Sequence, residues 1–269
     1  IVSPGTILSD SDARLSNTIG CLWVRSIKGR GLTPATRVVA GAILDVHTGQ
    51  PVMFQATTED RHDPVAYDEL ERRMAVHRPA ECIIVHNLGE KGTDLPAYAG
   101  CLEAKVHLVD EGAATRMAAR AAKASQQTYQ LEALNQFYSD AENVLNDTER
   151  EYDLALQALV LLLDFAKYHG QGLTKNLSSP LLETNPSRLY LGNHSLLQLN
   201  LIGDSRCSGR YGSVERLLNQ CVTPMGERAF TRAITSPTTI AADLEKAYDR
   251  TSRLLEREEW RLLRAGLSE

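Results

Sequence analysis

Hydrophobic and polar positions alternate in short runs up to about residue 112. Five segments are rich in residues that favour strands, and they cover 18–24, 37–46, 51–56, 82–85 and 106–109. The turn at Thr48-Gly49 between two of them indicates an antiparallel hairpin. Apolar positions at helical spacing predict a helix over 64–77. Residues 1–112 are therefore predicted to form an α/β domain with a mixed sheet.

From residue 113 the chain becomes rich in Ala, Gln and Leu, and strand-forming runs become scarce. Long helices are predicted over 114–138, 152–168 and 241–267, with a long loop over 169–186. The helix over 152–168 is apolar almost all round, so it must be surrounded by protein. Its apolar run of about ten residues is shorter than the ~20 that span a bilayer. We expect an all-α domain over 113–269 and no membrane partner.

The junction near residue 223 has the residue types that start a helix. Thr223 can cap a helix with its hydroxyl, and Pro224 fits the first helical position, where no amide hydrogen is needed. Gly226 would permit close backbone approach between this helix and the Leu-rich one before it. The pattern predicts a helical hairpin with a packed structural pivot, formed by Thr223, Pro224, Met225 and Gly226.

Residues 213–228 read Ser-Val-Glu-Arg-Leu-Leu-Asn-Gln-Cys-Val-Thr-Pro-Met-Gly-Glu-Arg. With Pro237, they resemble the signature at the start of the helical core of the MutS family of DNA mismatch-repair proteins. Three segments of the first half resemble the connector domain of this family, in the same order along the chain: its start at 1–6, a hairpin at 41–49 and a helix-to-strand turn at 78–84.

Several positions depart from the family pattern. His47 stands where the family has Ser, Gly192 where it has Asp, and Gln198-Leu199-Asn200 where it has Asn-Leu-Glu. These departures indicate a divergent branch. Four positions are similar to the large MutS homologues of giant viruses and octocoral mitochondria: Asn219, Cys221, Thr223 and Phe230.

The resemblance implies an RNase H-like connector domain over 1–112 and the N-terminal part of a helical core and lever domain over 113–269. It implies that the parent protein binds mismatched double-stranded DNA together with a second MutS-like subunit and uses ATP to switch state. The connector would dock a MutL-type partner. A MutS paralogue that acts in recombination or binds DNA junctions is an alternative with the same architecture.

The chain lacks the usual motifs of a catalytic centre. It has no Gly-x-x-x-x-Gly-Lys-Ser/Thr loop for nucleotide phosphates, no His-x-x-x-His spacing and no Gly-x-Ser-x-Gly elbow. We therefore expect this chain not to be an enzyme and to hold no cofactor or metal. By the resemblance, ATP and Mg would be bound by a C-terminal ATPase domain of the parent protein.

An RNase H-like fold also raises the alternative of a nuclease. Asp45, Glu81 and Asp110 would then gather two metal ions, since hard cations need several oxygen ligands. However, Asp45 ends its predicted strand and Glu81 begins another. Unless these strands are antiparallel neighbours, their carboxylates would lie at opposite edges of the sheet. Asp45 is also explained as an Asx-type turn residue before Thr48-Gly49.

Five arginines follow one another at helical spacing near the end of the chain: Arg250, Arg253, Arg257, Arg261 and Arg264. Steps of three and four residues would place them on one stripe of a single long helix. Such a stripe fits a DNA-facing surface, and it equally fits a solvated face whose charge is balanced by neighbouring glutamates. A basic loop that includes Arg25 and Arg37 leaves the same two interpretations open.

The composition restricts where DNA could bind and which cellular compartment the chain fits. The chain has 269 residues and a net charge of −5, so any DNA contact must come from a local patch. The five cysteines include no Cys-x-x-Cys pair, which favours an intracellular, reducing compartment over a disulfide framework. The chain begins at Ile1 without a Met and ends within a predicted helix. We therefore expect it to be part of a longer protein.

Overall fold

A computed structural model describes most of the chain. The described residues are 18–29, 35–46, 48–59, 79–101, 104–148, 152–169, 177–183, 193–203, 209–257 and 259–267, with the single residues 67, 70, 71, 73, 74, 77, 189 and 191. The chain divides into two compact units, Ile1–Thr184 and Asn185–Glu269. Each unit is described by itself.

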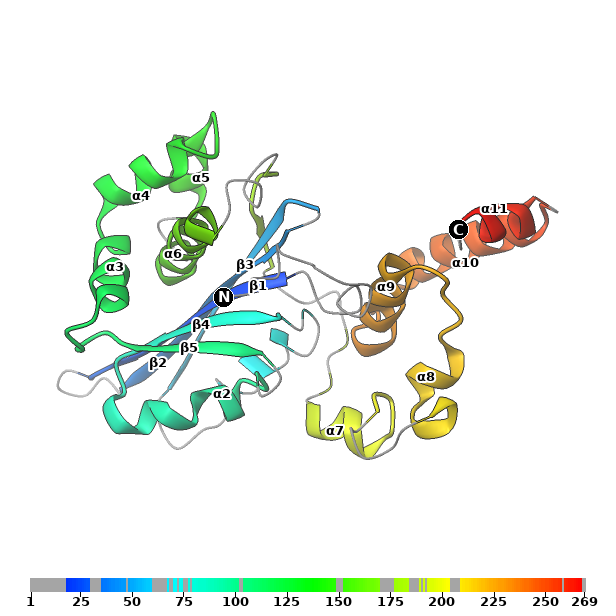
Figure 1. The fold of residues 1–269 in the computed structure, drawn as a ribbon, viewed down its shortest axis with the longest axis horizontal. Helices are drawn as coiled ribbons and strands as arrows, with labels where there is room; N and C mark the ends of the chain where they lie inside the picture. The colour runs from blue at the N-terminus through cyan, green and yellow to red at the C-terminus, as the bar shows by residue number, and fades with distance from the viewer. Residues whose placement is uncertain are drawn as a thin grey trace. The chain divides into compact units, whose positions relative to one another are not determined.

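The first unit is built on a six-stranded mixed sheet (Figure 1). Its strands are β1 (Thr18–Ile27), β2 (Thr36–Asp45), β3 (Gln50–Glu59), β4 (Glu81–His86), β5 (Lys105–Asp110) and β6 (Leu181–Leu182). Their order across the sheet is β5-β4-β1-β2-β3-β6. Strands β1, β2 and β3 pair antiparallel, whereas β4 is parallel to β1, β5 to β4, and β6 to β3.

The predicted hairpin between β2 and β3 is confirmed. Gly49 donates its amide hydrogen to the Asp45 carbonyl at 2.9 Å and has a φ of 65°. Glycine adopts this left-handed conformation without the steric cost that a side chain imposes. The turn thus joins the two strands in the register that places Asp45 opposite Gln50.

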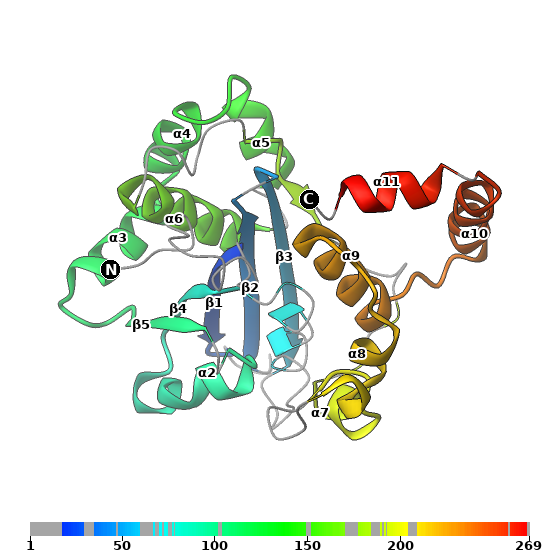
Figure 2. The same ribbon diagram turned by 45° about the vertical axis from the view of Figure 1, so that its right-hand side comes forward.

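Helices cover both faces of the sheet (Figure 2). On one face, α6 (Asp153–His169) lies across the strands together with α3 (Arg116–Ala124), α4 (Gln127–Asn135) and α5 (Ala141–Thr148). The other face is covered by helical residues that include Leu70 and Met74, and by α2 (Leu95–Tyr98), which follows a 3-10 turn at Gly89–Asp94. The predicted helix over 64–77 is confirmed at its described residues.

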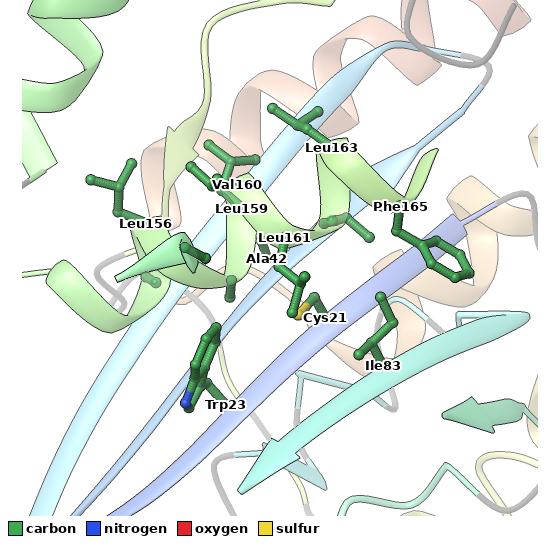
Figure 3. Close-up of a cluster of buried hydrophobic side chains, with 14 of the residues drawn as sticks. Cys21, Trp23, Ala42, Ile83, Leu156, Leu159, Val160, Leu161, Leu163 and Phe165 are labelled. Carbon is green, nitrogen blue, oxygen red and sulfur yellow. The ribbon is translucent and has the colours of Figure 1, made fainter. Parts of the chain in front are cut away.

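Side chains of β1 alternate between two buried clusters. Cys21 and Trp23 pack beneath α6, where Figure 3 shows them with residues of that helix. Leu22 and Val24 belong to the cluster on the opposite face. Because successive side chains of a strand point to opposite faces, a strand buried on both sides is apolar at nearly every position. This explains the continuous apolar character of β1 in the sequence.

The helix α6 confirms the prediction of a buried core helix, since every residue from Leu154 to Leu163 is buried. The elements that pack on α6 differ from the prediction, which placed this helix in an all-α domain. It packs on β1, β2 and β3, and also on α3, α4 and α5. These helices therefore belong to the compact unit of the strands. The structure divides the chain after Thr184, and not at the predicted boundary of residue 112.

Two predicted long helices are each divided. The segment 114–138 forms α3 and α4, separated at Ser125 and Gln126. The segment 241–267 forms α10 (Ala241–Leu255) and α11 (Trp260–Gly266). Helical periodicity continues through both breaks in the sequence, so spacing alone did not locate them.

The second unit is helical. Besides α10 and α11, it contains α7 (Asn193–Gln198), a 3-10 turn at Arg210–Gly212, α8 (Val214–Leu218) and α9 (Pro224–Thr235). The amide of Val214 donates to the Asn200 carbonyl at 2.8 Å and joins the start of α8 to the turn after α7. In the described part of the chain, no helix combines the length and the apolar character needed to cross a membrane.

Candidate functional site

The predicted helix start at Thr223 is confirmed. Thr223 has extended backbone angles, and its Oγ1 accepts a hydrogen bond from the amide of Gly226 at 3.1 Å. Helix α9 begins at Pro224, which needs no amide partner there. Whether Thr223, Pro224, Met225 and Gly226 act as a pivot stays a prediction, but their local geometry is that of a capped helix start.

Gly226 does not mediate the predicted close approach of two helix backbones. A Cβ built at this position would lie 3.1 Å from Thr223 Oγ1 and 3.3 Å from Cys221 Cβ. The crowding therefore comes from side chains of the turn that precedes α9, and not from the backbone of a second helix. The adjacent Met225 is 70% exposed, so it does not pack within the unit.

Side-chain hydrogen bonds connect α8 to α9. Ser213 caps α8 by accepting from the Arg216 amide at 3.2 Å. In the connection between the helices, Asn219 Oδ1 accepts from the Cys221 amide at 3.1 Å. Glu215 on α8 accepts a hydrogen bond from the Thr231 hydroxyl on α9. Residues 213–235 thus form a hairpin held at both helix starts and between the helices, as the sequence predicted.

We expect Thr223→Ala to destabilise the second unit by about 1 kcal/mol, because the Gly226 amide loses its capping acceptor. Urea unfolding followed by the circular dichroism of the helices measures this change. Thr223→Ser is the matched control, since it retains the hydroxyl and should stay close to wild type. Equal stabilities of the Ala and Ser variants would contradict the capping role.

The five arginines do not form the predicted single stripe. Arg250 and Arg253 lie on α10, Arg257 lies in the break between helices, and the last two lie on α11. All five are exposed. Two have local contacts: the Arg261 guanidinium lies 5.6 Å from the centre of the Trp260 ring, and Arg264 donates to the Gln220 carbonyl at 3.0 Å. A DNA-facing role for these arginines stays a prediction.

The three carboxylates of the nuclease alternative are not brought together. Thr18 of β1 lies opposite Asp45, and its neighbour Ile19 lies opposite Glu81, so both carboxylates lie at the same edge of the sheet. Consecutive positions of β1 face opposite sides, which places Asp45 and Glu81 on opposite faces. Asp110 lies at the far end of β5. Among the described residues, no group of three or more Asp, Glu, His or Cys could hold a metal ion.

The expectation that Asp45 and Glu81 lie at opposite edges was therefore wrong, because β1 separates their strands and is antiparallel to one and parallel to the other. The Asx turn is present, since Asp45 Oδ1 accepts from the Thr48 amide at 3.3 Å. Glu81 has structural partners of its own. Its Oε1 lies 2.7 Å from His107 Nε2 and 3.5 Å from Lys105 Nζ.

Arg25, in the predicted basic loop, is held by β1 and by the turn after β5. Its Nη2 lies 2.7 Å from Glu111 Oε1, and the indole of Trp23 donates to the same oxygen. The guanidinium also lies 5.6 Å from the centre of the Trp23 ring. This cluster fixes the carboxyl end of β1 to the end of β5, which gives Arg25 a structural role.

A buried ionic cluster of Arg73, His77 and Glu183 was not predicted from the sequence. Arg73 is 3% exposed and forms an ion pair with Glu183, whose Oε2 also lies 3.6 Å from His77 Nε2. Burial by itself would raise the pKa of Glu183, but the hydrogen bond from His77 and the positive charge of Arg73 lower it to about 2. The Glu183 amide donates to the Met53 carbonyl at 2.8 Å, so the cluster anchors the segment that contains β6 to the sheet.

Comparison with known proteins relates both parts of the chain to DNA mismatch repair. No model of a protein family matches the sequence. A mutS homologue of Acanthamoeba polyphaga mimivirus, described as a DNA mismatch repair protein, is 26% identical over an alignment of 254 residues, and the match covers 85% of this chain and 22% of the viral protein. The DNA mismatch repair protein MutS of Methanosarcina barkeri is 25% identical over an alignment of 241 residues, and the match covers 88% of this chain and 25% of the archaeal protein.

These matches show that the chain is related to the MutS family of DNA mismatch-repair proteins. The predicted resemblance is thereby confirmed, and one of the two relatives comes from a giant virus. The chain spans about a quarter of the length of the curated relatives that it matches, 22% and 25% respectively.

Proposed function

We propose that the chain is a segment of a MutS-like protein that acts in DNA mismatch repair. The observation that carries the proposal is the similarity to two MutS proteins over 85% and 88% of the chain. It covers more than either compact unit alone. The capped helix start at Thr223 supports it further, because this turn carries the residues that resemble the family signature.

We propose that the first unit is an RNase H-like connector domain and that it extends to Thr184. Three antiparallel strands in series, with two further strands added in parallel beside β1, support this assignment. The packing of α3 to α6 on this sheet supports the longer boundary. Residues 185–269 would then begin the helical core and lever domain.

In this proposal the chain is not itself an enzyme. It couples the binding of mismatched double-stranded DNA to a distal ATPase, where ATP and Mg would be bound by other parts of the parent protein. Coupling of this kind requires rigid elements with two arrangements whose equilibrium both sites influence. A second MutS-like subunit and a MutL-type protein are the proposed partners, the latter docking on the connector.

A chimeric protein tests the assignment. The corresponding segment of the Methanosarcina barkeri MutS protein is replaced by this chain, and binding to a mismatched duplex, a matched duplex and a four-way junction is compared with the unaltered protein. We expect the chimera to keep the unaltered protein's order of preference for the three DNAs. A folded chimera that selects the junction instead would favour the recombination paralogue and contradict the proposal.

A further inference from the structure

Two cysteines are buried on the face of the sheet that α2 covers. Cys82 is the second residue of β4, and Cys101 follows the short turn at the end of α2. They are 0% and 3% exposed, and both belong to the apolar cluster that contains Leu95 and Ala99. Neither thiol belongs to the helix start at Thr223 or to the ionic clusters of the first unit.

The main chain brings the two cysteines to the same end of the sheet. The amide of Ala104 donates to the Cys101 carbonyl at 3.2 Å and closes a turn directly before β5. The amide of Lys105 then donates to the Ala80 carbonyl at 2.9 Å, directly before β4. Both cysteines therefore lie near the point where β4 and β5 begin, and α2 is beside β5 in both views (Figure 1, Figure 2).

The two thiols also interact with each other. The Cys82 thiol donates a hydrogen bond to the Cys101 sulfur. This bond lowers the pKa of Cys101 against the opposing effect of burial, and it raises the pKa of Cys82 together with burial. Cys101 is therefore the first of the two to lose its proton, and a thiolate is the nucleophilic form of cysteine. Among the described residues, no other side chain forms a hydrogen bond to either sulfur, and their remaining contacts are main-chain carbonyls 3.7 Å away.

We propose that Cys82 and Cys101 are a redox-sensitive pair, which hydrogen peroxide converts into a disulfide. The Cys101 thiolate attacks one oxygen of the peroxide, the O–O bond breaks and hydroxide leaves, which gives a sulfenic acid. The Cys82 thiol then attacks this sulfur, the S–S bond forms, the S–O bond breaks and water leaves. The two thiols lose two electrons and two protons in total, and the peroxide is reduced to two molecules of water.

The disulfide connects β4 to the segment that follows α2. It closes the chain from Cys82 to Cys101 into a loop that contains the 3-10 turn at Gly89–Asp94 and α2. A cross-link of this kind restricts the unfolded chain more than the folded chain, so the oxidised form is the more stable one. In a reducing compartment other thiols reverse the bond, which makes it a switch and not a permanent cross-link. The pair does not depend on the function proposed above.

Peptide mapping of the folded chain after treatment with hydrogen peroxide tests the proposal. Trypsin places Cys82 in peptide 74–91 and Cys101 in peptide 92–105. We expect these two peptides to be joined in a digest without reductant and to be released by dithiothreitol. Peroxide reaches the buried pair only when this segment opens locally, so the link should form more slowly than Cys221 is oxidised, because Cys221 is only partly buried.

Two substitutions separate this pair from the other buried thiol of the sheet. Cys101→Ala removes the nucleophile and should leave Cys82 reduced and peptide 74–91 unlinked. Cys21→Ala is the matched control, since Cys21 is also buried but belongs to the cluster on the opposite face. This variant should form the link as the wild type does. The melting temperature of the wild type should be higher after oxidation than after reduction, and Cys101→Ala should lose this difference.

Folded protein without the link between 74–91 and 92–105, at peroxide concentrations that oxidise Cys221, would overturn the proposal. So would a link that forms only in urea, because the two thiols would then be inert packing groups in the native state. An oxidised wild type that melts at or below the temperature of the reduced form would overturn the stabilising role of the bond. If Cys101→Ala does not fold, the map of the wild type decides the result, since it needs no substitution.

Discussion

Leu159→Ala is expected to lower the free energy of unfolding of the first unit by about 3 kcal/mol, within the 2–5 kcal/mol found for such substitutions. Leu159 is fully buried in the middle of α6, and Figure 3 shows it in the cluster between this helix and the sheet. Removing its branched side chain leaves a cavity that the packed strands cannot fill without moving. The loss combines the transfer free energy of the methyl groups with the cost of that cavity.

The fluorescence of Trp23 measures this loss of stability at the contact between the sheet and α6. Trp23 is 1% exposed on β1 beneath α6, and changing Trp260 to Phe removes the other tryptophan. We expect Leu159→Ala to shift the urea transition of Trp23 together with that of the helices. Leu181→Ala is the matched control, since Leu181 is 57% exposed on β6 and its truncation should cost little.

An unshifted Trp23 transition, with earlier loss of helical circular dichroism, would contradict the packing described above. It would mean that the helices 113–169 unfold separately from the sheet, as the predicted boundary at residue 112 requires.

Glu183→Gln is expected to destabilise the first unit by about 3 kcal/mol at neutral pH, because it leaves the buried charge of Arg73 without a counter-charge. The pKa of Glu183 is about 2 in the folded protein, against 4.5 for an unperturbed carboxyl group. Because the folded pKa is the lower one, the carboxylate stabilises the fold fully above pH 4.5. This contribution is lost as the pH falls from 4.5 to about 2.

Urea unfolding at pH 7, 4 and 3 checks the prediction. The difference between wild type and Glu183→Gln should be largest at pH 7 and should shrink toward pH 3, since the carboxylate becomes protonated in the unfolded state first. Glu132→Gln on the exposed side of α4 is the control and should change stability by less than about 0.5 kcal/mol. A difference that stays constant with pH would show that the ionised form of Glu183 contributes nothing.

Local features of this fold could be predicted from the sequence. Thr223 and Pro224 carry their capping chemistry in their own residue types, and Thr48-Gly49 carries the left-handed turn in the same way. The burial of α6 follows from its apolar character on all sides, because such a helix has no face suited to water. These predictions needed only residues near one another in the chain.

Other features depend on which distant residues meet. The apolar character of α6 predicted that other elements pack around it, but not that the sheet is one of them. The predicted boundary at residue 112 therefore differs from the division after Thr184 in the structure. Arg73 and Glu183 are brought together by the alignment of β6 with β3, which no local pattern indicates. The faces of Asp45 and Glu81 depend on strand order and register, which were not available from spacing.

The helix breaks show a further limit. The arginines from Arg250 to Arg264 keep helical spacing in the sequence, although α10 ends at Leu255 and α11 begins at Trp260. A stripe inferred from spacing assumes one continuous axis, and a break rotates the second half by an amount that spacing does not record. The same assumption of one continuous axis led to the prediction of a single helix over 114–138, where the structure has α3 and α4.

We propose that this segment couples DNA binding to ATP hydrolysis in its parent protein. The most direct measurement is the rate of ATP hydrolysis by the archaeal chimera, with and without a mismatched duplex, beside the unaltered protein under the same conditions. We expect the mismatched duplex to change the rate of the chimera by the same factor as that of the unaltered protein. A chimera that binds the mismatch and hydrolyses ATP, but at a rate that the DNA does not change, would contradict the proposed coupling.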